Sequence, residues 1–183
     1  MKKIPLIFLT ALLLLGCGGG NVVLDNARTE AVTFSFKGGE TVEVEAEGRS
    51  SIDLEPGTHE VEIKLGDSVV ADTSFKLKTG GIVHSGGSRY VIWKQLYGLQ
   101  NDRATLLNEK WVEVDSIRVY GDFTVYEPEW IFLEENWEYG LDDDFPESKT
   151  MYVTEDFQIE SKVFRSQDMI TYYKTLVAKP EEK

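Results

Sequence analysis

The chain has 183 residues, a formal net charge of −13 at pH 7 and a single cysteine. Nucleic-acid binding depends on clusters of Lys and Arg that neutralise phosphates, and the sequence contains no such cluster. The acidic balance therefore argues against nucleic acid as a partner. The lone cysteine leaves no second thiol for an internal disulfide, so stability is expected to come from packing.

The first element in the chain is a predicted secretion signal. Lys2 and Lys3 precede an almost uninterrupted apolar run from Ile4 to Leu15. A membrane-spanning helix needs about 20 apolar residues, and this run is shorter. Its length and its positive start are typical of a signal peptide, which predicts removal of residues 1–16.

The end of that run, Leu14 to Cys17, resembles the lipobox of bacterial lipoproteins. The resemblance implies cleavage between Gly16 and Cys17 and transfer of a diacylglycerol group to the Cys17 sulfur. Each buried methylene contributes about 0.8 kcal/mol, so two or three acyl chains make such an anchor effectively permanent. We therefore expect a lipid-anchored protein of the cell envelope.

Residues 17–21 are predicted to be the lipid anchor and a short glycine tether, which would hold the folded body close to the bilayer. Gly18 is not the Asp that retains enterobacterial lipoproteins in the inner membrane. An outer-membrane address is therefore favoured if the source has two membranes.

Residues 22–79 are predicted to form a β-sandwich module. Val32, Phe34 and Phe36 alternate with polar residues, and the same period of two recurs in four later segments: 42–46, 52–54, 61–65 and 75–77. Turn residues separate the segments at 38–39, 56–57 and 66–67. Short strands at this regular spacing favour an immunoglobulin-like sandwich.

Within this module the sequence from Leu54 to Val61, Leu-Glu-Pro-Gly-Thr-His-Glu-Val, resembles one signature of bacterial surface proteins. It is similar to the strand, Pro-Gly turn, His, strand pattern of PEGA-type and related immunoglobulin-like modules. The resemblance spans residues 22–78. It implies a structural or adhesive unit rather than an enzyme, and it carries over no binding residue.

The stretch from Thr79 to Ser88 contains four glycines and is the expected domain boundary, with one long loop as the alternative. Residues 88–183 are predicted to form a second β-rich (α+β) domain. Its expected strands are 90–97, 111–115, 117–126 with a turn or bulge at Gly121, 151–154 and 159–164.

The last predicted element is an amphipathic helix. Ser166 is a good N-cap, and Asp168 complements the helix dipole in the first turn. The apolar stripe consists of Met169, Ile170, Tyr173, Leu176 and Val177. We expect this stripe to cover the second sheet, and docking of a partner helix is the alternative.

The densest candidate for a site is the acidic and aromatic segment 127–147. Trp130, Trp137 and Tyr139 could form a platform on which sugar rings stack. Carboxylates are also abundant there, so a glycosidase with two facing carboxylates is a further hypothesis. A solvated acidic loop between strands is the simplest interpretation.

The same segment contains candidates for a calcium site, since hard cations prefer clustered carboxylates. They are Asp142, Asp143, Asp144 and Glu147, and their spacing does not follow that of an EF-hand loop. His59 and His84 lie far apart without a companion cysteine, which argues against a zinc site of standard spacing.

The sequence thus predicts a non-enzymatic envelope lipoprotein with a structural or binding role. No cofactor is expected. Its predicted partners are the membrane, through the covalent lipid, and envelope proteins or glycans.

Overall fold

The computed structural model describes residues 20–98, 103–146, 148–150 and 157–178. The predicted signal peptide, the cleavage site at Gly16, Cys17, the calcium candidate Glu147 and the strand expected at 151–154 lie outside these residues. The prediction of a mostly β chain with a C-terminal helix is confirmed, since three four-stranded sheets account for most of the described residues.

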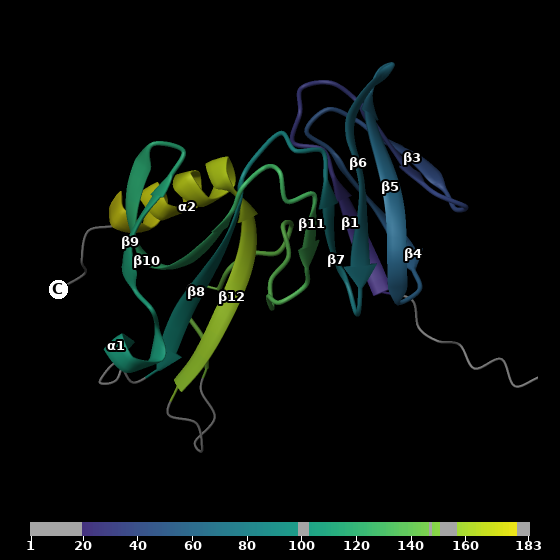
Figure 1. Ribbon diagram of the computed structural model, residues 1–183. Helices are drawn as coiled ribbons and strands as arrows, with labels where there is room; N and C mark the ends of the chain where they lie inside the picture. The colour runs from purple at the N-terminus through teal and green to yellow at the C-terminus, as the bar shows by residue number, and fades with distance from the viewer. Residues whose placement is uncertain (1–19, 99–102, 147, 151–156, 179–183) are drawn as a thin grey trace, which may run out of the picture.

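The first two sheets share one hydrophobic core. One sheet has the order β3 (Thr41–Val44), β2 (Val32–Phe36), β5 (Gly57–Leu65), β6 (Ser68–Leu77). The other has the order β11 (Phe132–Glu134), β7 (Gly81–His84), β1 (Gly20–Asp25), β4 (Arg49–Leu54). Side chains from both sheets, including Phe34, Ile63, Val22 and Leu24, are buried in this core (Figure 1).

The alternation read from the sequence holds along these strands. Phe34 and its neighbours two positions away are buried in β2, while Thr33 and Ser35 are only partly so. The predicted turn at Gly38 is confirmed, because this glycine has a φ of 73° that other residues rarely adopt. Ala46 departs from the prediction: β3 ends at Val44, and Ala46 is exposed in the turn that follows.

The glycine-rich stretch predicted as a boundary or long loop contains a strand instead. β7 pairs in parallel with β1 and antiparallel with β11, which comes from the later half of the chain. All four residues of β7 are buried, including His84. A strand covered on both faces has no alternating pattern, so the expected signal was absent.

The third sheet has the order β12 (Phe157–Arg165), β8 (Tyr90–Gly98), β10 (Ile117–Tyr126), β9 (Lys110–Val114). Helix α1 (Arg103–Leu106) precedes β9. β10 pairs with β9 up to Gly121 and with β8 from Asp122 onward. The glycine therefore marks a change of partner within one continuous strand, where the sequence predicted a turn or bulge.

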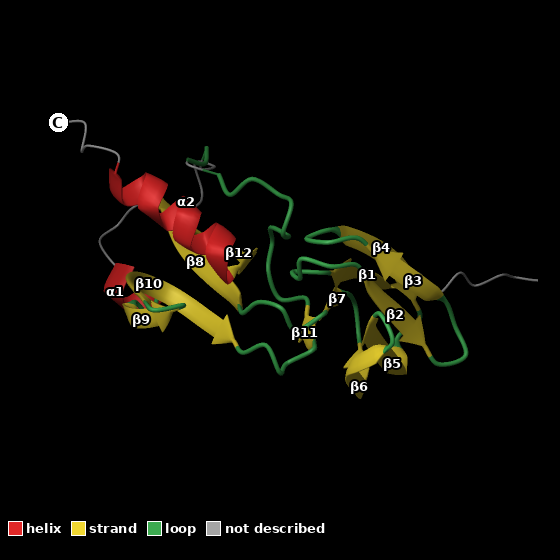
Figure 2. Ribbon diagram, turned by 90° about the horizontal axis from the view of Figure 1, so that it is seen from above, coloured by secondary structure: helices red, strands yellow, loops and turns green. Residues whose placement is uncertain are grey.

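Helix α2 (Ser166–Ala178) packs against its own sheet, as predicted (Figure 2). Met169 and Ile170 are buried beside Trp93 and Phe164. Val177 is exposed, so its predicted place on the buried stripe is wrong. None of the described helices combines the length and apolar character required to cross a bilayer.

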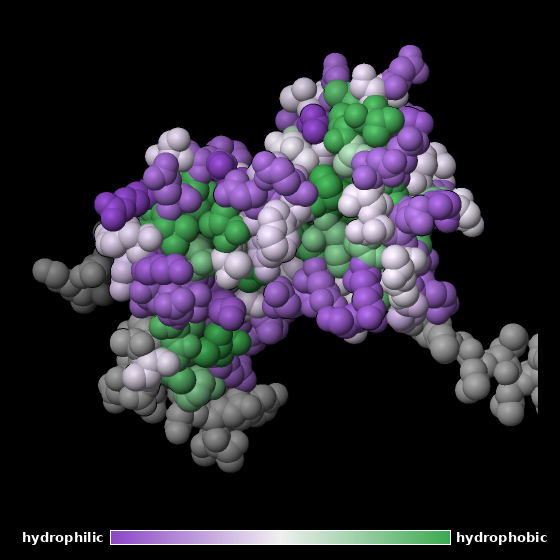
Figure 3. Space-filling view, viewed as in Figure 1, coloured by the Kyte–Doolittle hydropathy of each residue, from purple (hydrophilic) through white to green (hydrophobic). Residues whose placement is uncertain are grey.

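A third cluster joins the two halves of the molecule. Ile82 and Leu133 contribute from the sheet that contains β1, and Tyr90, Ile92 and Val163 contribute from the third sheet. The sheet containing β1 is therefore packed on both faces. On the outer surface, Figure 3 shows small hydrophobic patches separated by hydrophilic residues.

Candidate functional site

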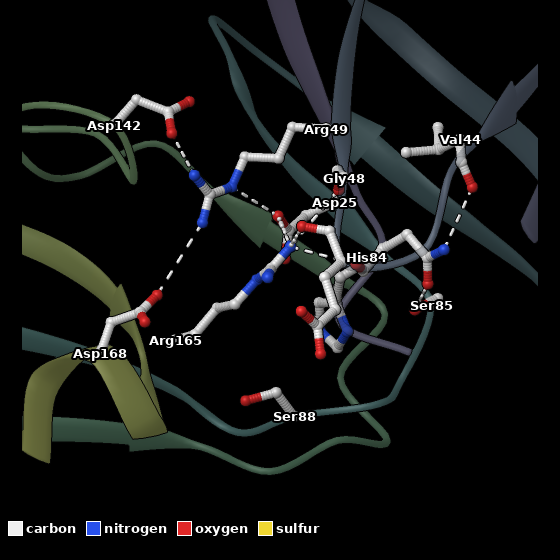
Figure 4. Close-up of polar contacts among 12 residues, drawn as sticks. Asp25, Val44, Gly48, Arg49, His84, Ser85, Ser88, Asp142, Arg165 and Asp168 are labelled. Atoms are coloured by element: carbon white, nitrogen blue, oxygen red, sulfur yellow. Dashed lines mark hydrogen bonds and ion pairs between the residues drawn. The ribbon is translucent and has the colours of Figure 1, made fainter. Parts of the chain in front are cut away.

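Four strand ends converge where the sheets meet, and each places a polar side chain there. Asp25 ends β1, Arg49 begins β4, Tyr90 begins β8 and Arg165 ends β12. The strand registers produce this convergence, since Asp25 lies opposite Arg49 and Tyr90 lies opposite Arg165. We call Asp25, Arg49, Tyr90 and Arg165 the junction network, and Figure 4 shows three of its members, Asp25, Arg49 and Arg165.

Asp25 is the centre of the junction network and is 0% exposed. Arg165 donates to its two oxygens at 2.9 and 2.8 Å, and Arg49 donates at 2.8 Å. The Tyr90 hydroxyl also donates to Asp25. A buried carboxylate is costly unless it is paired and hydrogen-bonded, and these donors meet both conditions.

The surroundings of Asp25 also fix the protonation state of Tyr90. Burial of the phenol, together with the negative charge of Asp25, raises the pKa of Tyr90 well above its ordinary value. The hydroxyl therefore remains protonated and acts as a donor at neutral pH. In this arrangement the carboxylate accepts and Tyr90 donates.

His84, opposite Asp25 in the β1–β7 pair, is fully buried. The Gly86 amide donates to Nδ1 at 3.1 Å, which places the ring proton on Nε2, where it is donated to the Trp130 carbonyl. Burial lowers the pKa of His84 to about 4. The neutral ring thus ties the loop before β11 to strand β7.

Two clefts flank the junction network, and Arg165 and Asp168 line both. The larger has a volume of about 830 Å³, and the smaller about 520 Å³. Asp142, on the rim of the larger cleft, forms an ion pair with Arg49. Clefts between packed units are common places for ligands, so this region is the candidate site of the fold.

The wall of the larger cleft is held by a buried lysine. Lys162 donates from Nζ to the carbonyl oxygens of Gly140, Leu141 and Asp143. Its ammonium lies 4.8 Å from the centre of the Phe164 ring. Burial lowers the pKa of Lys162. The loop after Tyr139 is therefore fixed by a cation from β12.

The predicted calcium candidates lie in this loop and already have other contacts. Asp142 pairs with Arg49, and Asp143 accepts from the Gly140 amide at 2.6 Å. Asp144 is exposed. Within the described part of the chain no three His, Cys, Asp or Glu side chains are grouped as metal ligands.

The structure places the three predicted platform aromatics against different neighbours. Trp130 is 62% exposed and packs edge-on against Tyr126. Trp137 is half-buried against the cluster that joins the halves, and Tyr139 is half-buried against Phe145. Of the three, Trp130 alone is largely open to a ligand.

The junction network and one exposed aromatic pair, Trp111 with Tyr120, were not predicted from the sequence. The network unites residues up to 140 positions apart, which no local pattern reveals. One signal was present: Asp25 directly follows the apolar residues Val22 to Leu24, and a charged residue at the end of a buried strand needs a partner of opposite charge.

The junction network is suited to holding elements together. Arg49, Tyr90 and Arg165 all donate hydrogen bonds to Asp25. Both ring nitrogens of His84 also form hydrogen bonds. These groups therefore stabilise the contacts between strands beside the cleft. In comparisons with known proteins, neither a family model nor a curated protein matches this chain.

Proposed function

We propose that the chain is a lipid-anchored protein of the bacterial cell envelope with a non-enzymatic structural or binding role. In this proposal Cys17 carries the lipid after cleavage at Gly16. The outer membrane is the favoured address in a cell with two membranes. Envelope proteins or glycans are the partners.

The observation that carries the proposal is the course of strand β1. It begins at the buried Gly20, three positions after Cys17. Such a tether spans at most about 11 Å. The same strand ends at Asp25, which pairs with Arg165 of the third sheet. An anchor at Cys17 would therefore hold the whole body through one central strand.

Under this proposal the two halves of the fold have different positions relative to the bilayer. The two sheets around the first core would be the immunoglobulin-like module nearest the bilayer, and residues 88–183 would form the second domain. β11 adds a strand from that second part to the first, and the shared cluster around Ile82 and Leu133 packs the two parts together. A rigid spacer or adaptor fits this packing.

The non-enzymatic role is supported by the state of the most deeply buried polar groups. Asp25 is saturated by donors, and His84 is neutral with both nitrogens bonded. A catalytic acid or base must lie within hydrogen-bond reach of the substrate and must be able to donate or accept a proton there. These two groups are instead used to fasten strands.

A glycan-binding role for segment 127–147 is the second candidate. It is favoured by one observation, the wide exposure of Trp130. Loss of polysaccharide binding on substitution of Trp130 by Ala would support it.

The test of the principal proposal compares the natural chain with a Cys17→Ser variant in its own host. We expect mass spectrometry to find a diacylglycerol-modified Cys17 as the first residue of the natural protein, which fractionates with membranes. The Ser variant should lose both the lipid and the membrane fraction. An unmodified thiol on a freely soluble natural protein would overturn the proposal.

A control separates anchoring from folding. Cys17 precedes the first described strand, β1, so the Ser variant should retain the far-UV circular dichroism of the natural protein. A second variant, Lys37→Gln, changes an exposed residue of the first module and should remain in the membrane fraction.

A further inference from the structure

The β9–β10 hairpin presents two large aromatic side chains on its open face. Trp111 and Tyr120 are directly opposite in the strand register, and their ring centroids are 5.4 Å apart. They are 58% and 47% exposed. The opposite face of the same hairpin carries Val114 and Val119, which are buried in the core under helix α2.

The fold does not require aromatic rings at these two positions. The alternating burial of β10 assigns Val119 to the core and Tyr120 to solvent. A cross-strand pair stabilises a hairpin by roughly 0.2–1 kcal/mol, and β-branched or charged pairs supply similar amounts. Binding of a ligand over the two rings would explain why a large indole and a phenol are exposed to water at these positions.

Charged groups border the two rings on the same face. Glu113 and Arg118 are opposite each other in the register, two positions along the strands from Trp111 and Tyr120. The Arg118 guanidinium lies 5.3 Å from the centre of the Trp111 ring. The surface thus combines flat apolar rings with a carboxylate acceptor and a fork of donors.

These features together define the chemistry of the ligand. Glu113 and Arg118 carry opposite charges, so this pair favours neither a polyanion nor a polycation. Flat rings beside a donor and an acceptor match a molecule with an apolar face and hydroxyl groups around its edge. A neutral sugar has this character.

The position of the hairpin favours a polymer outside the bilayer. In Figures 1 and 2, β9 and β10 lie at the opposite end of the molecule from the start of β1. Under the proposed function, which this step assumes, the anchor is next to β1. The hairpin that carries the aromatic pair then lies at the end of the molecule far from the bilayer, within reach of polysaccharide in the envelope.

We propose that Trp111 and Tyr120, with Glu113 and Arg118, form a binding site for a neutral polysaccharide. The two rings stack on sugar faces, and the charged pair bonds the hydroxyl groups. This site is separate from segment 127–147 and from the junction network.

The experiment measures depletion of the purified full chain, in detergent micelles, by two insoluble neutral polysaccharides, cellulose and chitin. We expect binding to at least one polymer, and a loss of about tenfold or more in affinity for Trp111→Ala and for Tyr120→Ala. Trp111→Phe retains a flat ring and should recover part of the affinity. Unchanged circular dichroism shows that each variant is folded.

The matched control is Phe157→Ala, which removes an exposed aromatic ring from β12 in the same sheet and should bind as the natural chain does. Three results overturn the proposal. The natural chain binds no polymer, the Trp111→Ala and Tyr120→Ala variants bind as tightly as the natural chain, or binding is lost in Trp130→Ala and not in these two variants. Binding of neutral phospholipid vesicles that is lost in the Trp111 variant would also overturn it, by identifying a lipid surface.

This result is independent of lipid attachment. Depletion by polysaccharide is measured on the purified chain whether or not Cys17 is acylated. A soluble, unmodified protein that still binds through Trp111 would contradict the anchor and retain the sugar site.

Discussion

Arg165 donates from Nε and Nη2 to the two carboxylate oxygens of Asp25, although 140 residues separate them in the chain. This paired contact joins the end of β1 to the end of β12. Two parallel bonds fix both distance and orientation, which a single bond does not. The relative position of the two halves is therefore set at a buried point as well as by the apolar cluster around Ile82 and Leu133.

Replacement of Asp25 by Asn should strongly destabilise the protein. The amide keeps the shape but leaves the Arg49 and Arg165 guanidiniums without their counter-charge, and breaking a buried pair in this way costs about 3–5 kcal/mol. The free energy of unfolding in urea measures the effect. Asp53→Asn, on the exposed face of β4, is the control and should change it by less than about 0.5 kcal/mol. Equal effects of the two variants would contradict the role given to Asp25.

Leu133→Ala should weaken the first half of the molecule from a position in the second half. Leu133 is buried and lies opposite Ile82 in the β11–β7 register. Truncation of a buried leucine costs about 2–5 kcal/mol. Hydrogen exchange of the β7 amides should become faster.

Leu176→Ala, on the half-buried face of α2, is the comparison for this experiment. It should speed exchange in α2 and the third sheet more than in β7. If Leu133→Ala left exchange in β7 unchanged, the two halves would not be coupled through β11.

The alternation of apolar residues was enough to predict β2 and β5, and a continuous apolar run predicted β8, because each strand has its own local pattern. β7 was missed since a short strand buried on both faces, between glycines, has the composition of an apolar loop. The fold of residues 81–84 depends on β11, almost fifty positions away.

The junction network could not be predicted for a related reason. Its members are brought together by two strand registers and by the packing of two sheets, and a sequence fixes a register through packing across the whole sheet. The aromatic residues show the same limit. Composition picked out Trp130, Trp137 and Tyr139, whereas exposure depends on which face of the fold each ring occupies.

His84 should make stability depend on pH. Burial lowers the pKa of His84 in the folded chain to about 4, from 6.5 in the unfolded chain. Between these values the unfolded chain binds a proton that the folded chain does not, so the free energy of unfolding falls as the pH falls. The contribution is complete above pH 6.5 and is lost progressively toward pH 4, by about 3 kcal/mol in all.

The measurement is urea unfolding at a series of pH values from 7 to 5, a window chosen to lie above most carboxylate titration. His84→Gln should remove most of the slope, and His59→Gln should retain it. A natural protein whose unfolding free energy is flat across this window would refute the assignment.

Gly20→Ala should destabilise the strand that follows the predicted anchor. A Cβ atom at Gly20 would overlap the backbone carbonyl oxygen of Thr79, which cannot rotate away as a side chain can. Either β1 or Thr79, two residues before β7, must shift, and overpacking of this kind costs about 1–3 kcal/mol. In a chain of this size each kcal/mol lowers the thermal midpoint by roughly 2–4 °C. Gly39→Ala is the matched control, since its nearest neighbour, the Phe36 Cβ, lies at an ordinary contact distance of 3.5 Å. Equal midpoints for the two variants would mean that β1 does not approach Thr79 this closely.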